Sequence, residues 1–559
     1  MKKIRKFALI FVFSQLLSSV FAVTRGGQDL ILCGHWVYSA LLSLEMEMGR
    51  VTFSDQAPVS INELKTYLED IDYERLSEPG KKQYDRIIEY IEEKNWSWNA
   101  GIFSIGVEPS ANLELYYKSE EDTPWVYDYT KRQSIIDMPI KIGLADYCSV
   151  YMGLTLSQSY YARYSTDNYV NQIFVNDAFD PALTHENYLS AGYLWDNGVG
   201  INLRTGVGTQ STGHSLMPSI IMSEYMTDTP YVNLRIFSPV FNYNFNVTQF
   251  TRETYLYTHR IETRFFKKIQ FSFIEGVLPY SSFDLRFVNP FAIFHGYGLF
   301  NEYHEDCSSY FGFKISYVPV KYLRLYTLYS QNEHTMSSEG SGEPEGTGFQ
   351  AGIESYLPSK NGYFHFGAEF YYTNPYLFIK QSPNVSFAKV FTEMIEGTGN
   401  YYQWMGNPLG PDSLAFQIAA GYEVPDKWSV DLAYNFAAKG EFAGTRIFDS
   451  DHANWQKSDL SFDGTNWPYN PYNDPDNTLK APHGVVEYVN SITVKGTYKP
   501  ADYLSFMVQP SYVFMFNHNH VKNQSRQGFE IAFSVKTQFT KISKKEFSSE
   551  SLFKDGKEK

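Results

Sequence analysis

The sequence has few cysteines and, beyond its first residues, no long apolar run. Its three cysteines, Cys33, Cys148 and Cys307, are far apart and odd in number, so they predict neither a zinc site nor a disulfide framework. No stretch after residue 22 approaches the roughly 18 consecutive apolar residues of a membrane-spanning helix. The sequence therefore excludes a helical membrane protein.

The chain also lacks an excess of positive charge. Its 62 acidic and 47 basic side chains give a formal net charge of −15, which argues against nucleic acid as a partner. We find no constellation of nucleophile and base, and no spacing typical of metal ligands. We therefore expect no enzymatic activity, no metal and no cofactor.

Aromatic residues, in contrast, are abundant. The chain has 45 Tyr, 43 Phe and 9 Trp. Such residues are enriched where the wall of a membrane β-barrel meets the two membrane interfaces. A large soluble β-protein would fit the same composition, so the pattern along the chain must distinguish the two.

The first 22 residues have the pattern of a secretory signal peptide. Lys2, Lys3, Arg5 and Lys6 precede the apolar run 7–22, which ends in a small residue, Ala22. The alternative is an uncleaved anchor helix, but the run is shorter than the roughly 20 residues that spanning requires. We expect export and cleavage after Ala22.

Residues 23–97 are predicted to form a short helical segment. Ser60 and Glu63 have the spacing of a capping box, in which both side chains satisfy free backbone donors at a helix start. Apolar side chains recur at helical spacing further on, at Tyr84, Ile87, Ile88 and Ile91. These amphipathic helices must bury one face against each other or against another part of the chain.

After about residue 98 the apolar period changes to two, which is typical of β-strands. The clearest example is Trp428, Val430, Leu432 and Tyr434, which alternate with small or polar residues. Tight turns such as 318–321 alternate with long polar connections such as 374–412. This pattern predicts a large transmembrane antiparallel β-barrel of roughly 16–18 strands over residues 98–539. A soluble sandwich also alternates, but it does not explain the asymmetry in loop length.

The end of the chain agrees with a barrel. The last predicted strand ends at Phe539, and the lysine-rich tail 540–559 is predicted to be disordered. The expected location is the bacterial outer membrane. Expected partners are outer-membrane lipid and the barrel-assembly machinery.

Several short motifs occur in a recognisable order. They include Leu216-Met217-Pro218-Ser219, Asp284-Leu285-Arg286-Phe287-Val288-Asn289-Pro290-Phe291 and Asn407-Pro408-Leu409-Gly410. With the helical N-terminus, this order resembles a divergent form of the capsule-assembly Wzi-type family of outer-membrane proteins. The resemblance implies about eighteen strands, helices that plug the periplasmic mouth, and surface polysaccharide as a candidate partner.

The connection 440–482 is a candidate ligand-binding surface. It carries aromatic side chains among many Asp and Asn residues, namely Trp455, Trp467, Tyr469 and Tyr472. Aromatic planes beside carboxylates and amides suit the apolar faces and hydroxyls of sugars. The alternative is that these aromatic side chains pack the loop against the barrel rim.

A second candidate is the charged row Arg260, Glu262 and Arg264, whose alternate spacing places all three side chains on one face of a strand. In the lumen, this row could orient a ligand. It could equally be structural, since buried charges must be paired.

The function that the resemblance implies is binding or organising surface polysaccharide without catalysis. A porin-like diffusion channel and a surface adhesin or structural protein are the alternatives.

Overall fold

We analysed a computed structural model of the chain. It describes residues 25–51, 53–93, 96–100, 102–157, 180–290, 292–294, 307–332, 345–380, 383–392, 400–441 and 481–541. The predicted signal peptide, residues 1–22, lies outside the described residues. Most of the tail 540–559 and of the 440–482 loop also lies outside them.

The N-terminal segment contains three α-helices, α2 (Trp36–Met48), α3 (Ile61–Leu68) and α4 (Glu78–Glu92). They share a hydrophobic core with the strand β3 (Val59–Ser60), which pairs with β1 (Leu30–Ile31). Ile87 and Ile91 of the predicted apolar stripe are buried in this core. None of the helices among the described residues is long and apolar enough to cross a membrane.

The rest of the chain is dominated by a closed antiparallel barrel of 18 strands, within the 16–18 that the sequence pattern predicted and equal to the number that the resemblance implied. β5 and β6 together make one strand of the wall, and β7 and β8 make another. β27 pairs with β6 and β4 pairs with β5, so β27 and β4 together occupy one strand position beside the β5–β6 strand. The wall elements are β4 (Trp96–Ala100), β5 (Phe103–Val107), β6 (Ser110–Lys118), β7 (Ile136–Asp137), β8 (Ile140–Leu144), β9 (Cys148–Ser157), β10 (Asp180–Leu194), β11 (Gly200–Gly208), β13 (Thr229–Phe237), β14 (Phe241–Thr251), β15 (Thr254–Phe265), β16 (Ile269–Pro279), β17 (Cys307–Tyr317), β18 (Arg324–Asn332), β19 (Gly346–Pro358), β20 (Tyr363–Thr373), β23 (Ser413–Val424), β24 (Trp428–Lys439), β25 (Glu487–Ala501), β26 (Leu504–Phe516) and β27 (Ser525–Gln538).

The wall closes where the last strand pairs with the first long one. Ile531 of β27 lies opposite Tyr117 of β6. Closure removes the free edges that an open sheet would expose. Besides β1 and β3, four further short strands among the described residues lie outside the wall in two small sheets, β2 (Gln56–Ala57) with β12 (Ser211–Thr212), and β21 (Ala388–Thr392) with β22 (Asn400–Trp404).

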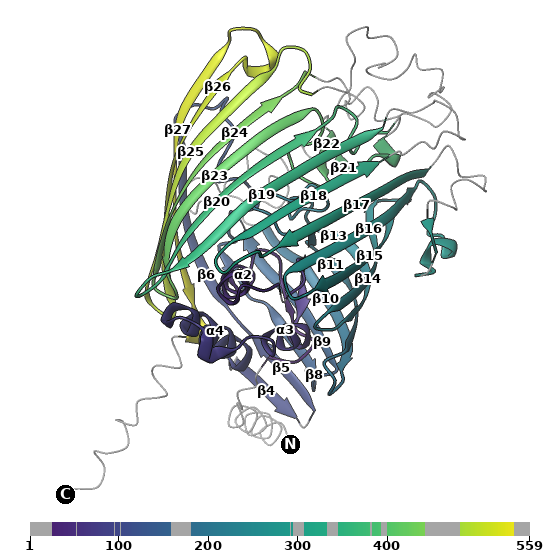
Figure 1. Cartoon of the computed structure of the whole chain (residues 1–559), viewed down its shortest axis with the longest axis vertical. Coiled ribbons are helices and arrows are strands. Elements are labelled where there is room, and N and C mark those ends of the chain that lie inside the picture. Colours follow the sequence, from purple (N-terminus) through teal and green to yellow (C-terminus); the bar gives the residue numbers. More distant parts are fainter. Residues whose placement is uncertain are drawn as a thin grey trace, which may run out of the picture.

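The two ends of the barrel differ, as the loop lengths predicted. Tight turns join the strands at the end where α2, α3 and α4 lie (Figure 1). The helical segment contacts these turns directly: the Val51 amide donates to the carbonyl of Lys267, and the Tyr322 amide donates to the carbonyl of Met46. The helices therefore lie at the end of the barrel whose strands are joined by short turns, the kind of turn that faces the periplasm in outer-membrane barrels.

The two faces of the wall differ in the same regular way. Trp428, Val430 and Leu432, which alternate in the sequence, are 40%, 46% and 50% exposed on the outer face. Polar side chains such as Asn244 and Gln350 point to the lumen and are buried. An apolar outer face around a polar inner face is the arrangement of a wall that crosses a membrane.

Candidate functional site in the lumen

The N-terminal segment occupies the half of the lumen nearest the tight turns, which we call the lower half. It binds the wall mainly through buried polar groups. Asp55, between α2 and α3, contacts the Arg260 guanidinium of β15 and lies 2.6 Å from Lys314 Nζ of β17. Tyr363 of β20 donates a hydrogen bond of 2.6 Å to Glu47 of α2. Charged groups buried in this way are stable only when they are paired.

The predicted charged row is part of this lower layer. Glu262 accepts hydrogen bonds from Arg260 at 2.6 Å and from Arg264 at 2.5 Å, and Ser54 donates to it at 2.8 Å. All three charged side chains are buried. The row therefore holds the N-terminal segment against the wall; contact with a ligand remains a prediction.

Asp55 has an electrostatic environment that keeps it ionised. Burial alone raises its pKa, but Arg260 and Lys314 outweigh burial and hold the pKa of Asp55 well below its ordinary value. Each unit of such a shift corresponds to about 1.4 kcal/mol between the two protonation states. The ionised form is therefore the one that docks the segment.

The charged residues of the wall also contact a loop that projects into the lumen, residues 209–228. Lys314 Nζ and an Arg324 nitrogen donate to the backbone carbonyl of His214 at 2.8 and 3.0 Å. Burial lowers the pKa of His214 to about 4, with Arg324 and Lys314 adding to the effect and Glu354 opposing it. The His214 ring is therefore neutral at pH 7.

The predicted capping box forms only in part. The Ser60 hydroxyl accepts from the Glu63 amide at 3.2 Å, as predicted for a helix N-cap. The Glu63 carboxylate, however, lies 2.6 Å from Arg235 of β13 and accepts hydrogen bonds from Tyr67 and Asn242. The prediction for Glu63 is wrong because a buried arginine is a stronger partner than a backbone amide.

The upper half of the lumen is filled by two segments that enter from the opposite end. Buried side chains of 209–228, such as Ile220 and Met222, pack with Phe378 and Met405 of the connection 374–412. Lumen-facing apolar side chains of the wall complete this core, and they include Leu256, Ile274, Leu278, Leu328 and Tyr371. The lumen thus contains a hydrophobic core of its own.

Two of the sequence motifs meet in this core. Leu216 and Met217 donate their amides to Glu369 of β20 at 2.8 and 3.0 Å. Asn407 donates from its side chain to the carbonyl of Pro218 at 2.8 Å. The motifs at 216–219 and 407–410 therefore position the inward segments.

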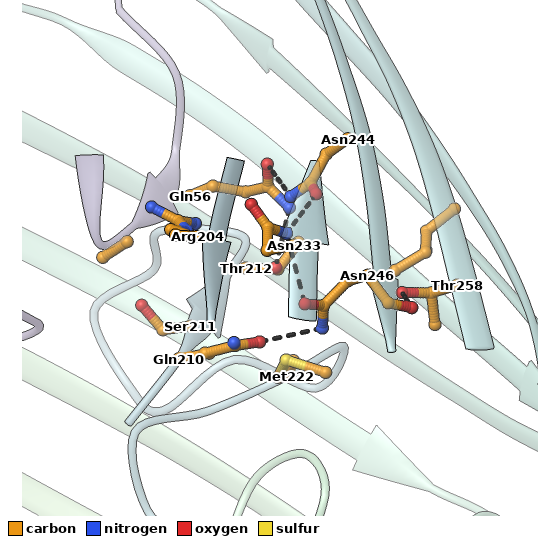
Figure 2. A pocket seen from close by; sticks show the side chains of 12 residues that line it. Gln56, Arg204, Gln210, Ser211, Thr212, Met222, Asn233, Asn244, Asn246 and Thr258 are labelled. Carbon is orange, nitrogen blue, oxygen red and sulfur yellow. Dashed lines mark hydrogen bonds between the residues drawn. The ribbon is translucent and has the colours of Figure 1, made fainter. Parts of the chain in front are cut away.

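The lower and upper fillings join through backbone pairing. Ala57 pairs with Ser211 and Gln56 with Thr212 in the small β2–β12 sheet. Beside this sheet lies a small cavity lined by amide side chains, among them Asn233, Asn244 and Asn246 (Figure 2). Gln56 and Gln210 accept hydrogen bonds from Asn244 and Asn246 across it, at 2.8 and 2.9 Å. Its size is on the order of one water molecule.

The other predicted ligand contacts, Trp455, Trp467, Tyr469 and Tyr472, lie outside the described residues. Sequence reasoning missed Asp55 and Lys314, the charges that complete the row of Arg260, Glu262 and Arg264. Lys314 could have been noted as the only charged residue in the predicted strand 311–317. Asp55 lies in a connection with no periodicity, so no signal pointed to it.

The arrangement can be compared with known proteins. The chain matches no family model, and no curated protein matches its sequence. Among solved structures, it is similar to Wzi of Escherichia coli, described as an outer membrane protein involved in group 1 capsule assembly and a carbohydrate-binding β-barrel. The identity is 12% over 92% of this chain and 100% of that chain, with a TM-score of 0.56. The chain has the fold of Wzi.

Other solved barrels share less of the architecture. OprD of Pseudomonas aeruginosa is 7% identical over 78% of this chain and 95% of its own, with a TM-score of 0.38. The outer membrane channel DcaP of Acinetobacter baumannii is 10% identical over 79% and 99%, with a TM-score of 0.33. The match to Wzi confirms the expected resemblance to Wzi-type barrels at the level of the fold.

Proposed function

We propose that this protein is an exported, non-enzymatic outer-membrane barrel that binds or organises polysaccharide at the bacterial surface. The observation that carries the proposal is the filled lumen. Within the described residues, protein extends without interruption from α2 and α3, through the β2–β12 pairing, to the apolar core around Ile220. A barrel filled in this way is suited to presenting a surface rather than to conducting solutes.

The fold of a carbohydrate-binding capsule-assembly barrel supports the same proposal. At 12% identity the likeness concerns the fold, so the ligand must be tested on this chain. The two functional alternatives are a diffusion channel and an adhesin or structural surface protein. The amide-lined cavity is polar enough for a channel, but it is on the order of one water molecule in size.

A conductance measurement on the full-length protein in planar bilayers tests the sealed lumen. We expect almost no steady current. Deleting residues 36–94 should leave a folded barrel with increased conductance, because the helical segment no longer occupies the lumen. A large stable current through the full-length protein would establish the channel alternative instead.

The 440–482 loop is the proposed sugar-contacting surface. It follows β24, which begins at a periplasmic tight turn and therefore ends at the extracellular side. Replacing Trp455 and Trp467 with alanine should abolish binding on a glycan array without changing the melting temperature. Replacing Trp428, on the lipid face, with alanine is the matched control and should leave binding intact. Retained binding in the double variant, or a large fall in its melting temperature, would mean that these side chains only pack.

Export can be tested independently of the ligand. N-terminal sequencing of the mature protein is expected to begin at Val23, because the proposed cleavage follows Ala22. A mature chain that begins at Met1 would refute the signal peptide.

A further inference from the structure

The outer face of β14, β15 and β16 differs from the rest of the wall. On β15 the even-numbered side chains from Thr258 to Arg264 point to the lumen, so Tyr257 and His259 point outward, as do the exposed Ile261 and Phe265. Tyr257 is nevertheless completely buried, and its outward-facing neighbours Phe245 and Val277 are 5% and 2% exposed. Something other than lipid covers this part of the wall.

The cover is a strap, residues 280–290 and 292–294, which follows β16 and folds back over the outside of the barrel. It is drawn in teal beside β14–β16 (Figure 1). The Asp284 amide donates to the Tyr257 hydroxyl at 3.0 Å, and the Tyr243 hydroxyl donates to the Pro290 carbonyl at 2.5 Å. Phe287 of the strap packs on Tyr257, with ring centroids 5.4 Å apart.

The strap covers a polar histidine–glutamate pair on the outer face. His259 Nε2 of β15 lies 2.8 Å from Glu275 Oε2 of β16, and the two side chains are 15% and 13% exposed. Phe294 of the strap lies over the His259 ring, at 4.7 Å between centroids. A polar or charged group on the lipid face of a barrel costs stability, most of all near the membrane midplane. Pairing and covering such groups both reduce that cost.

The free face of the strap is apolar. Leu285, Ile293 and Phe283 are 77%, 71% and 50% exposed. Arg286, an exposed cation beside them, lies 2.6 Å from Asp284, which offsets its charge. Ile261, two residues below His259 and so about 7 Å further along the strand, begins the lipid-facing band of the wall. The apolar face of the strap is therefore continuous with that band.

From this continuity we propose that the strap lies in the outer leaflet, where Phe283, Leu285 and Ile293 bind lipid hydrocarbon chains and Phe294 screens the His259–Glu275 pair from lipid. The strap is an extension of the membrane-facing wall made from an extracellular connection. This inference is independent of any polysaccharide ligand. The alternative occupants of the apolar face are water and a second copy of the chain.

Spin labelling of the full-length protein distinguishes lipid, water and a second copy of the chain as what contacts the apolar face of the strap. The native cysteines are first replaced with alanine, and a nitroxide is attached at Leu285→Cys or Ile293→Cys in proteoliposomes. We expect both labels to be accessible to oxygen, which partitions into lipid, and shielded from a water-soluble nickel complex. They should match a label at Leu432 on the lipid face and differ from a label at Glu121 in an exposed loop. Access to nickel would place the strap in water, and spin–spin broadening would place it between copies; either result overturns the proposal.

A double-mutant cycle tests the screening. Phe294→Ala should lower the melting temperature in the native background, where it uncovers the His259–Glu275 pair. The loss should be clearly smaller in a His259→Leu, Glu275→Leu background, where there is no polar pair to screen. An equal loss in both backgrounds would show that Phe294 only packs.

Discussion

Two parts of the chain occupy the lumen and pack against the wall through different chemistry. The N-terminal helical segment is called the lower filling, and the inward connections at the opposite end are called the upper filling. The lower filling is a helical segment with its own core, and it meets the wall through ion pairs such as those of Asp55 with Arg260 and Lys314. The upper filling consists of inward connections without such a core, and it shares apolar side chains such as Leu256 and Leu328 with the wall. The wall changes accordingly, from polar to apolar, along the same lumen-facing rows of β15 and β16.

The difference shows that the inner face of a barrel adapts to what fills it. The helical segment presents a polar surface to the wall, so the wall residues that contact it are charged. A connection with little regular structure buries its apolar side chains only by joining the wall. We expect the lower filling to undock as a unit, and the upper filling to be inseparable from the fold of the barrel.

The largest effect is expected from Asp55→Leu. This change leaves Arg260 and Lys314 buried without their shared partner, which costs about 3–5 kcal/mol. The N-terminal segment should become sensitive to limited proteolysis in the reconstituted protein. Asp70→Leu is the control: Asp70 pairs with Lys267 at side-chain exposures of 31% and 54%, and such surface pairs contribute about 0–1 kcal/mol. Equal sensitivity of the two variants would refute the role of Asp55.

The upper filling is tested by Ile220→Ala. Ile220 is completely buried in the lumen core, so the cavity should cost about 2–5 kcal/mol in the free energy of unfolding. Urea unfolding should show this loss equally at low and high salt, because no charge is involved. Ile261→Ala, on the lipid face, should cost much less. A marked salt dependence would contradict the distinction between the two fillings.

The wall itself is tested by a pair of neighbouring substitutions. Leu432→Arg places a charge on the lipid face and should cost roughly 2–4 kcal/mol near the midplane, whereas Ala433→Arg places it on the lumen side and should cost less. Folding yield into bilayers of defined composition measures both. If the two variants fold equally well, the assignment of the outer face is wrong.

The smallest expected effect is the change in protease protection of the N-terminal segment with pH, which depends on the titration of Asp55. Because the pKa of Asp55 is lowered on docking from its ordinary 3.8, its stabilisation is complete above that pH and is lost as the pH falls through the lower folded value. Protease protection of the segment should therefore persist to below pH 4, and Asp55→Asn should remove this acid step. Loss of protection beginning near pH 6 would point to a different titrating group.

Much of the architecture followed from local sequence patterns. The alternation at Trp428, Val430 and Leu432 predicted the outer face because successive side chains of a strand point to opposite sides, whatever the rest of the chain does. The tight turns and the stripe of Ile87 and Ile91 were equally local. The loop-length asymmetry favoured a membrane barrel over a soluble sandwich, whereas the position of the helices at one end followed only from the resemblance to Wzi-type barrels.

Tertiary structure alone decided which charges and which faces meet. Asp55 and Arg260 are 205 residues apart in sequence, so no local pattern relates them. Glu63 had the spacing of a cap, but Arg235 from β13 took its carboxylate. The motif that begins at Asp284 did not indicate that residues 284–290 lie outside the barrel, with the Asp284 amide against Tyr257. Periodicity specifies the two faces of a strand, whereas the partner of each face depends on closure of the whole barrel.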